Sequence, residues 1–192
     1  MSNQSDSSPQ PTAVRRVAFS LRRAGWISFW VQLVLAVVSG IILLFAILVA
    51  SQSPTQGGSS GVEGGLLFAF AGLGVLGFST YRAFYHTRLS QQLRGPHPGR
   101  PSRGETMKQM RVSLIANMVG MLLTLLGAEA INGILLAKAV SQPRGILEAS
   151  VNVRDFVQPL DIFIVLANTH TIVAHFVGIL SAIWLIEQIY KD

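Results

Sequence analysis

Residues 159–190 read PLDIFIVLANTHTIVAHFVGILSAIWLIEQIY, a segment long and apolar enough to cross a bilayer as one helix. The segment also carries polar side chains that cost free energy in hydrocarbon, namely Asp161, Asn168, His170, Thr171 and His175. Asp161, Asn168 and His175 recur at i, i+7 and i+14, and seven helical steps return to within about 20° of the starting direction. The stretch therefore predicts a membrane helix with one polar seam that faces protein.

The composition of the whole chain is that of a membrane protein. Apolar residues make up 50% of the sequence and charged residues only 12%, which is about half the charge density of an average soluble domain. There is no cysteine, so disulfides, thiolate metal sites and cysteine catalysis are excluded. The net charge is +6, but the positive side chains flank the apolar segments. This placement is typical of the charges that orient membrane helices. We therefore expect no nucleic-acid partner.

Hydropathy predicts an all-α, polytopic membrane protein with four transmembrane helices. The predicted spans cover about residues 26–50, 65–81, 112–136 and 162–187, within a membrane domain of residues 26–190. A polar, Pro/Ser/Gln-rich tail at residues 1–12 is expected to be disordered. The run GPHPGRP predicts a turn inside a basic loop of residues 82–111. A mixed segment, residues 137–158, separates the third and fourth spans.

A basic segment, residues 13–25, precedes the first span. Its apolar side chains share one helical face, while the arginines, Arg15, Arg16, Arg22 and Arg23, lie opposite or beside that face. Such a pattern predicts a short amphipathic helix lying on the anionic lipids of a leaflet. The alternative is a positive flank that only fixes the orientation of the first span. Both readings place the four arginines at the membrane surface.

The distribution of positive charge predicts the topology. Most of the 15 lysine and arginine residues fall in residues 13–25, in the basic loop or at Lys191. The positive-inside rule then places both termini and the basic loop in the cytoplasm. All three tryptophans and all three tyrosines, which favour the membrane interface, fall at the same ends of the spans.

The polar residues of the third and fourth spans form a candidate site. Along the helix axis, Glu129 is expected about 7.5 Å and Asn168 about 9 Å from the midplane, on the same side. If these helices pack together, a buried carboxylate meets an amide and imidazoles, which suits iron or another divalent cation, or a proton relay. The alternative is structural, with a protonated glutamic acid hydrogen-bonded across an interface. The candidate metal ligands are Glu129, Asn168, His170 and His175.

Other polar and small residues of the spans suit contacts between helices. Ser28, Gln32 and Ser39 make a mild polar seam on the first span, and Gly72, Gly74 and Gly77 allow close approach of a backbone to the second. A homo-oligomer interface is expected on these two surfaces. No nucleophile-elbow, zincin or phosphate-loop motif is present in the sequence. We therefore expect no enzyme and no resident cofactor.

Three segments carry a resemblance to a known family. They are RRAGWISFWVQL at residues 22–33, LLGAEA at residues 125–130 with Gly133 and AKA at 137–139, and PLDIF at residues 159–163 with Asn168, Thr169 and HFVG at 175–178. Together they resemble the four-helix family of the chloroplast inner envelope called permease in chloroplasts. That family is also described as the twenty-one-kilodalton component of the inner-envelope protein import translocon, and its cyanobacterial relatives as a domain of unknown function. The resemblance spans about residues 20–187.

The resemblance implies two functions. The first is an iron or metal-ion permease, working as a homo-oligomer, with a polar pathway between the third and fourth spans. The second is a non-transporting component or assembly factor of a protein-translocation or other membrane complex. The sequence lacks the composition of a transit peptide, so we expect a cyanobacterial member in the plasma or thylakoid membrane.

Overall fold

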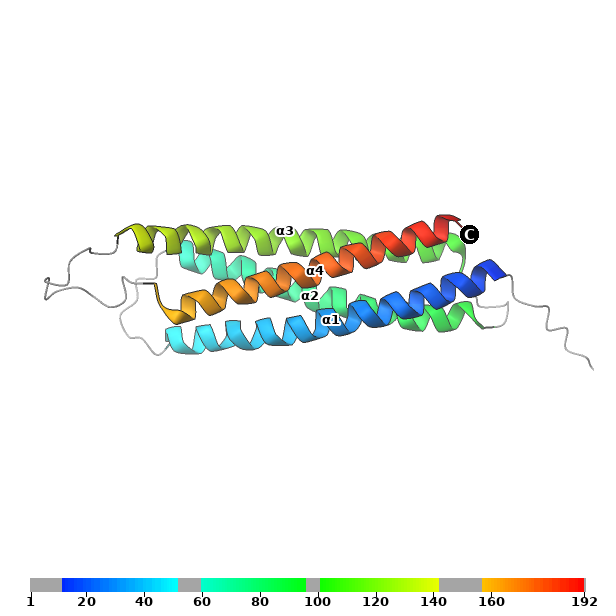
Figure 1. Cartoon of the computed structure of the whole chain (residues 1–192), viewed down its shortest axis with the longest axis horizontal. Coiled ribbons are helices and arrows are strands. Elements are labelled where there is room, and N and C mark those ends of the chain that lie inside the picture. Colours follow the sequence, from blue (N-terminus) through cyan, green and yellow to red (C-terminus); the bar gives the residue numbers. More distant parts are fainter. Residues whose placement is uncertain (1–11, 52–59, 96–100, 142–156, 192) are drawn as a thin grey trace, which may run out of the picture.

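The computed structural model describes residues 12–51, 60–95, 101–141 and 157–191. These residues form four α-helices (Figure 1): α1 (Thr12–Ser51), α2 (Ser60–Leu93), α3 (Arg103–Ser141) and α4 (Pro159–Lys191). All four are long and apolar enough to cross a membrane, and at 33 to 40 residues each is about 50–60 Å long. The predicted all-α architecture with four spans is confirmed. The predicted disordered tail lies almost entirely outside the described residues.

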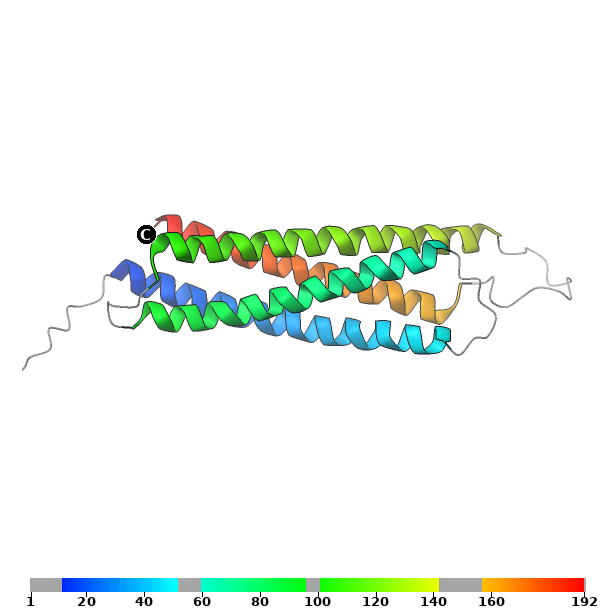
Figure 2. The same ribbon diagram turned by 180° about the vertical axis from the view of Figure 1, so that it is seen from behind.

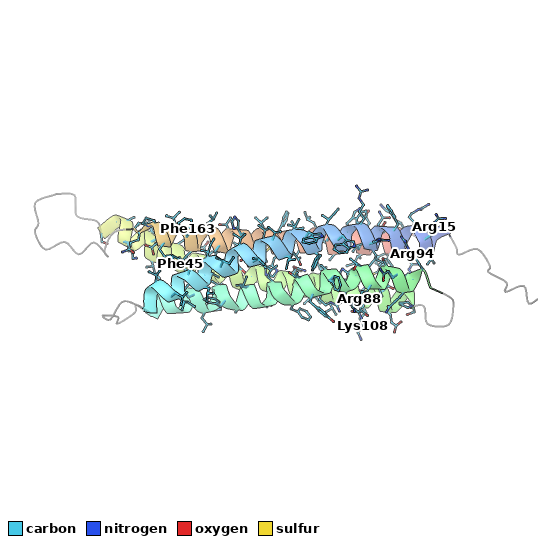
Figure 3. The ribbon with its side chains drawn as sticks, turned by 90° about the horizontal axis from the view of Figure 1, so that it is seen from below. Arg15, Phe45, Arg88, Arg94, Lys108 and Phe163 are labelled. Carbon is cyan, nitrogen blue, oxygen red and sulfur yellow. The ribbon has the colours of Figure 1, made fainter. Side chains whose placement is uncertain are left out.

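The helices form an up-down-up-down bundle, seen from both sides in Figures 1 and 2. Each helix packs against the next in sequence, and α4 closes the ring against α1. Two helix ends, that of α1 at Thr12 and that of α4 at Lys191, lie at one end of the bundle. Arg15, Arg88, Arg94 and Lys108 lie at this same end (Figure 3), which we call the basic end. The cytoplasmic placement of this end stays a prediction.

The N-terminal segment does not form a separate surface helix, so the amphipathic-helix reading of residues 13–25 is wrong. α1 runs without a break through this segment, and Gly25 within it is a point of close contact with α2. A Cβ at Gly25 would lie 3.1 Å from Thr87 Cγ2 and 3.2 Å from the Ala83 carbonyl oxygen. The apolar face of the N-terminal segment is buried against the other three helices, while Arg15, Arg16, Arg22 and Arg23 are exposed. This is what the positive-flank alternative predicts.

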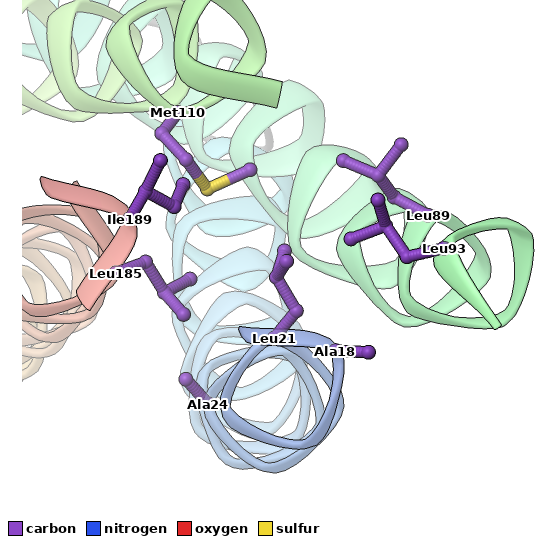
Figure 4. Close-up of a cluster of buried hydrophobic side chains, with 8 residues drawn as sticks. All are labelled: Ala18, Leu21, Ala24, Leu89, Leu93, Met110, Leu185 and Ile189. Atoms are coloured by element: carbon purple, nitrogen blue, oxygen red, sulfur yellow. The ribbon is translucent and has the colours of Figure 1, made fainter. Parts of the chain in front are cut away.

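The buried face of that segment belongs to an apolar cluster at the basic end (Figure 4). We call it the basic-end cluster, and it consists of Ala18, Leu21, Ala24, Leu89, Leu93, Met110, Leu185 and Ile189. A second apolar cluster, near the opposite end, consists of Leu43, Ala46, Ala69, Ile131, Ile164 and Ala167. The interior between these two clusters is rich in polar side chains and glycines, and it contains the candidate site.

The basic loop is much shorter than the predicted residues 82–111, because α2 continues to Leu93 and α3 begins at Arg103. The helix ends are stabilised by the basic-end cluster and by a capping box. Ser102 Oγ accepts a 3.1 Å hydrogen bond from the Glu105 amide, and Glu105 Oε2 accepts one of 3.1 Å from the Ser102 amide. α3 also extends to Ser141, into the predicted segment 137–158; residues 142–156 lie outside the described part.

Candidate functional site

A group of buried polar residues joins all four helices near the middle of the bundle. We call it the central polar layer, and it consists of Gln32 of α1, the Gly72 carbonyl of α2, Asn117 of α3 and His175 of α4. The side chains of Gln32, Asn117 and His175 are 1%, 2% and 0% exposed. The His175 ring lies 3.2 Å from Asn117 Oδ1 through Nδ1 and 3.2 Å from the Gly72 carbonyl oxygen through Nε2. The layer therefore ties α4 to both α2 and α3.

Asn117 is the centre of this layer. Its Nδ2 donates to the Ser113 carbonyl at 2.8 Å, and its Oδ1 accepts a 3.2 Å hydrogen bond from Gln32 Nε2. Gln32 Nε2 also lies 3.4 Å from the Ala174 carbonyl oxygen. These bonds connect α1 to α3 and α4.

The hydrogen bonds of His175 depend on its protonation. A backbone carbonyl only accepts, so Nε2–H donates to the Gly72 oxygen. A doubly protonated ring would donate its second N–H, at Nδ1, to Asn117 Oδ1 with the amide in its present orientation. A neutral ring would accept at Nδ1 and would require the Asn117 amide to rotate by half a turn. In both cases His175 bridges three helices.

Glycines give this layer its space. A Cβ at Gly120 would overlap the His175 imidazole ring, and a Cβ at Gly178 would overlap the amides of Asn117 and Gln32. Gly72 is likewise packed against the Thr124 side chain. By contrast, the other two glycines predicted for helix packing, Gly74 and Gly77, are exposed, and a Cβ added at either would have no atom within 4 Å. In and beside the central polar layer, close helix approach thus depends on Gly72, Gly120 and Gly178.

A second set of polar contacts lies between the central polar layer and the basic end. His86 Nε2 lies 2.9 Å from Ser113 Oγ, and Arg82 Nη2 donates to the Gln109 carbonyl at 2.7 Å. His86 falls within the loop predicted at residues 82–111, yet its side chain is only 5% exposed. Arg82 also lies over the Tyr85 ring, 5.7 Å from its centroid. The hydrogen bonds of His86 and Arg82 join α2 to α3.

The predicted pathway between α3 and α4 is not assembled. Asn168 and His175 are buried on one face of α4, 1% and 0% exposed, and His170 is half-buried. Glu129 is exposed, because the buried face of α3 is formed by other residues: Asn117, Gly120, Thr124, Gly127 and Ile131. The expectation that Glu129 meets Asn168 and the histidines is therefore wrong. Within the described ranges, no group of three His, Cys, Asp or Glu side chains could hold a metal ion.

The polar seam of α1 faces the inside of its own bundle. Ser28 and Ser39 are 3% and 0% exposed, and Ser39 Oγ donates to the Ala167 carbonyl of α4 at 2.9 Å. Gln32 is bonded as described above. The polar side chains of this seam therefore make contacts within one chain. The expectation of an interface between copies at this seam is wrong.

Some buried polar atoms have no hydrogen-bond partner among the described residues. They are Gln32 Oε1, Ser79 Oγ, both amide atoms of Asn168 and His170 Nδ1. Buried polar groups of this kind are commonly satisfied by ordered water. The interior can thus join helices by hydrogen bonds and hold water, but among the described residues it lacks a carboxylate to bind a cation.

Comparisons with known proteins agree with the resemblance seen in the sequence. The chain is 31% identical over 172 residues to the Arabidopsis thaliana protein named Protein TIC 21, chloroplastic. The alignment covers 88% of this chain but 56% of that protein, so the chain spans little more than half the length of this curated relative. No solved structure matches the chain. Residues 11–190, which cover all four helices except the last residue of α4, match the family described as a protein of unknown function, DUF3611. The chain is therefore an integral membrane protein that belongs to the DUF3611 family.

Proposed function

We propose that this chain is a non-transporting subunit, or an assembly factor, of a multiprotein membrane complex of the protein-translocation type. The similarity to TIC 21 supports this function, as does the translocon component that the three resembling segments imply. A cyanobacterial plasma or thylakoid membrane is the proposed location. Of the two functions considered from the sequence, this was the alternative to an iron permease.

The observation that carries the proposal is the direction of Glu129. A cation pathway needs charged or polar groups that face the interior of the bundle or a water-filled cavity. Glu129 instead faces outward, and the interior residues Asn117 and His175 are bonded to one another. An outward-facing carboxylate, together with Asn117 and His175 side chains that are engaged in hydrogen bonds between helices, fits a protein that binds other proteins.

The basic end supplies a second surface for partners. Arg88, Lys108 and Arg111 are exposed there, together with the four arginines of α1. Because this end extends past the aromatic residues of the membrane interface, it offers positive charge to acidic protein segments as well as to anionic lipids.

The test compares assembly with transport. The full-length chain, solubilised from its native membrane in a mild detergent, is expected to migrate on native gels in a discrete complex with at least one other integral membrane protein. The same protein in proteoliposomes is expected to take up ferrous ion no faster than empty liposomes do. Saturable ferrous uptake that Glu129→Gln abolishes in folded protein would overturn the proposal in favour of a permease.

A further inference from the structure

We propose that the outer face of α3 around Glu129 is the docking site for a transmembrane helix of a partner protein, and that this helix carries a lysine or arginine at the same depth. The inference rests on the proposed function and names the surface and the partner chemistry that this function would use. Three features of Glu129 support it: its depth, the direction of its side chain, and a carboxylate that no described residue pairs with.

Glu129 lies at the depth of the hydrocarbon. Along α3 it is about 27 Å from Arg111 and about 13 Å from Lys138. Lys138 marks the interface opposite the basic end, because its Nζ pairs with Asp161 Oδ2 at 3.2 Å beside the start of α4. The midpoint between Arg111 and Lys138 is about 7 Å from Glu129, whereas the hydrocarbon extends about 15 Å to each side of its centre.

The side chain of Glu129 belongs to the surface of the bundle. At 100° per residue it shares one narrow face of α3 with Leu122, Gly133 and Leu136, and this face is opposite the buried one. Leu122 and Leu136 are 58% and 65% exposed, and Glu129 is exposed between them. Among the described residues, no ion pair or hydrogen bond engages the Glu129 carboxylate.

An exposed carboxylate at this depth calls for a cover of opposite charge. Ionisable residues in membrane spans face protein or water and pair with one another, because hydrocarbon does not solvate them. The nearest cation along α3, Lys138, is already paired with Asp161. A basic side chain from another helix would neutralise Glu129 and satisfy its oxygens.

A second copy of the chain is the poorer occupant. Two copies related by a two-fold axis along the membrane normal would bring Glu129 against Glu129 at one depth, which opposes like charges.

The surface also suits a helix in shape, since Gly133 lies one turn from Glu129 and has nothing within 4 Å of its Cβ position. A partner backbone can therefore approach closely beside the carboxylate.

The experiment begins with site-specific photocrosslinking in native membranes. Benzoylphenylalanine placed at Leu122 or Leu136 of the full chain is expected to crosslink one other membrane protein. Mass spectrometry of the adduct is expected to place the crosslink in a transmembrane segment, within about one helical turn of a lysine or arginine. The same probe at Ile41 of α1, which is 63% exposed, serves as the control and is expected not to give this adduct.

Charge exchange then tests the pairing. Glu129→Lys is expected to lower the amount of complex at least tenfold, and replacing the partner's basic residue by glutamate is expected to restore it. Glu129→Leu should lower the complex similarly but leave the melting temperature in detergent unchanged, because no described residue forms a hydrogen bond or ion pair with Glu129. Glu187→Leu is the matched control: that carboxylate is paired with Lys191 at the basic end, and the complex should persist.

Each other outcome overturns the inference. An adduct between two copies of the chain, distinguished by mixing isotope-labelled and unlabelled protein, would identify a homo-oligomer face. An adduct in a segment without a basic residue, or with lipid alone, would remove the proposed partner chemistry. If Glu129→Leu and Glu129→Lys leave a demonstrated complex intact, the docking site fails while the proposed function stands; if no complex forms at all, both fail.

Discussion

The basic-end cluster and the central polar layer hold the same four helices together by different interactions. The cluster is made of leucine, isoleucine, methionine and alanine side chains, whereas the layer is made of two amides, an imidazole and a backbone carbonyl. The cluster lies beyond Trp26 and Trp184, which are exposed as interface residues are. The layer lies inside the span. The basic-end cluster is therefore on the water side, and the central polar layer is in the hydrocarbon.

This difference follows from the two solvents. Burial of apolar side chains stabilises a bundle in water, because it removes apolar surface from water. In lipid the surroundings are as apolar as leucine, so helix association depends on close packing at small residues and on hydrogen bonds between helices. The basic-end cluster and the central polar layer thus each use the interaction that their own solvent makes favourable.

The largest expected effect on stability comes from replacing a glycine that makes room for the side chains of the central polar layer. Gly120→Leu should lower the free energy of unfolding by more than about 3 kcal/mol, since the new side chain would displace the His175 ring and force α3 away from α4. The effect is measured by denaturant titration in detergent micelles. Gly133→Leu, on the same helix but with nothing near its Cβ position, is the control. Equal stability of the two variants would show that the layer is not tightly packed.

A smaller loss is expected in the basic-end cluster. Leu21 is 0% exposed, and Leu21→Ala should lower the free energy of unfolding by about 2–3 kcal/mol, as in a water-soluble core. Phe19→Ala, at a position that is 57% exposed, should have little effect. Similar small effects of both variants would instead favour a segment that lies on the membrane surface away from the bundle.

The four spans could be predicted from the sequence because hydropathy reports where a chain enters lipid. The ends of the helices could not, because outside the hydrocarbon polar residues are permitted in helices and loops alike. Leu89 and Met110 lie among charged residues, and only their packing in the basic-end cluster reveals that α2 and α3 continue there. Proline and glycine interrupt helices in either solvent, and the run at residues 95–101 falls between the end of α2 at Leu93 and the start of α3 at Arg103; the turn predicted there lies mostly outside the described residues.

The candidate site was predicted in part. Asn168 and His175 were correctly expected on the protein-facing seam of α4, because that seam is visible as a polar stripe on one helix. The depth of Glu129 along the axis of its helix could also be predicted. The face of the helix on which it lies could not, because the depth of a residue does not determine its direction around the helix axis. A stripe of small and polar residues, Ser113, Asn117, Gly120, Thr124 and Gly127, would have identified the buried face of α3 and placed Glu129 opposite it.

A moderate effect is expected for one hydrogen bond of the central polar layer. Gln32→Leu keeps the side-chain volume but removes the donor to Asn117 and to the Ala174 carbonyl, and should lower the free energy of unfolding by about 1–2 kcal/mol. A double-mutant cycle with Asn117→Leu measures the coupling directly. Additive losses would contradict a direct bond and would leave Gln32 as a packing residue only.

The smallest effect separates the lipid-facing glycines from the buried ones. A Cβ at Gly77 would have no atom within 4 Å. Gly77→Ala should therefore raise the free energy of unfolding of the isolated chain by about 0.5–1 kcal/mol, because alanine gives the unfolded chain less conformational freedom than glycine does. The native-gel complex provides the second readout. If a partner backbone approaches α2 at this exposed glycine, the same substitution should stabilise the chain yet reduce the complex. An unchanged complex would leave α3 as the docking face and make Gly77 a residue that only lipid contacts.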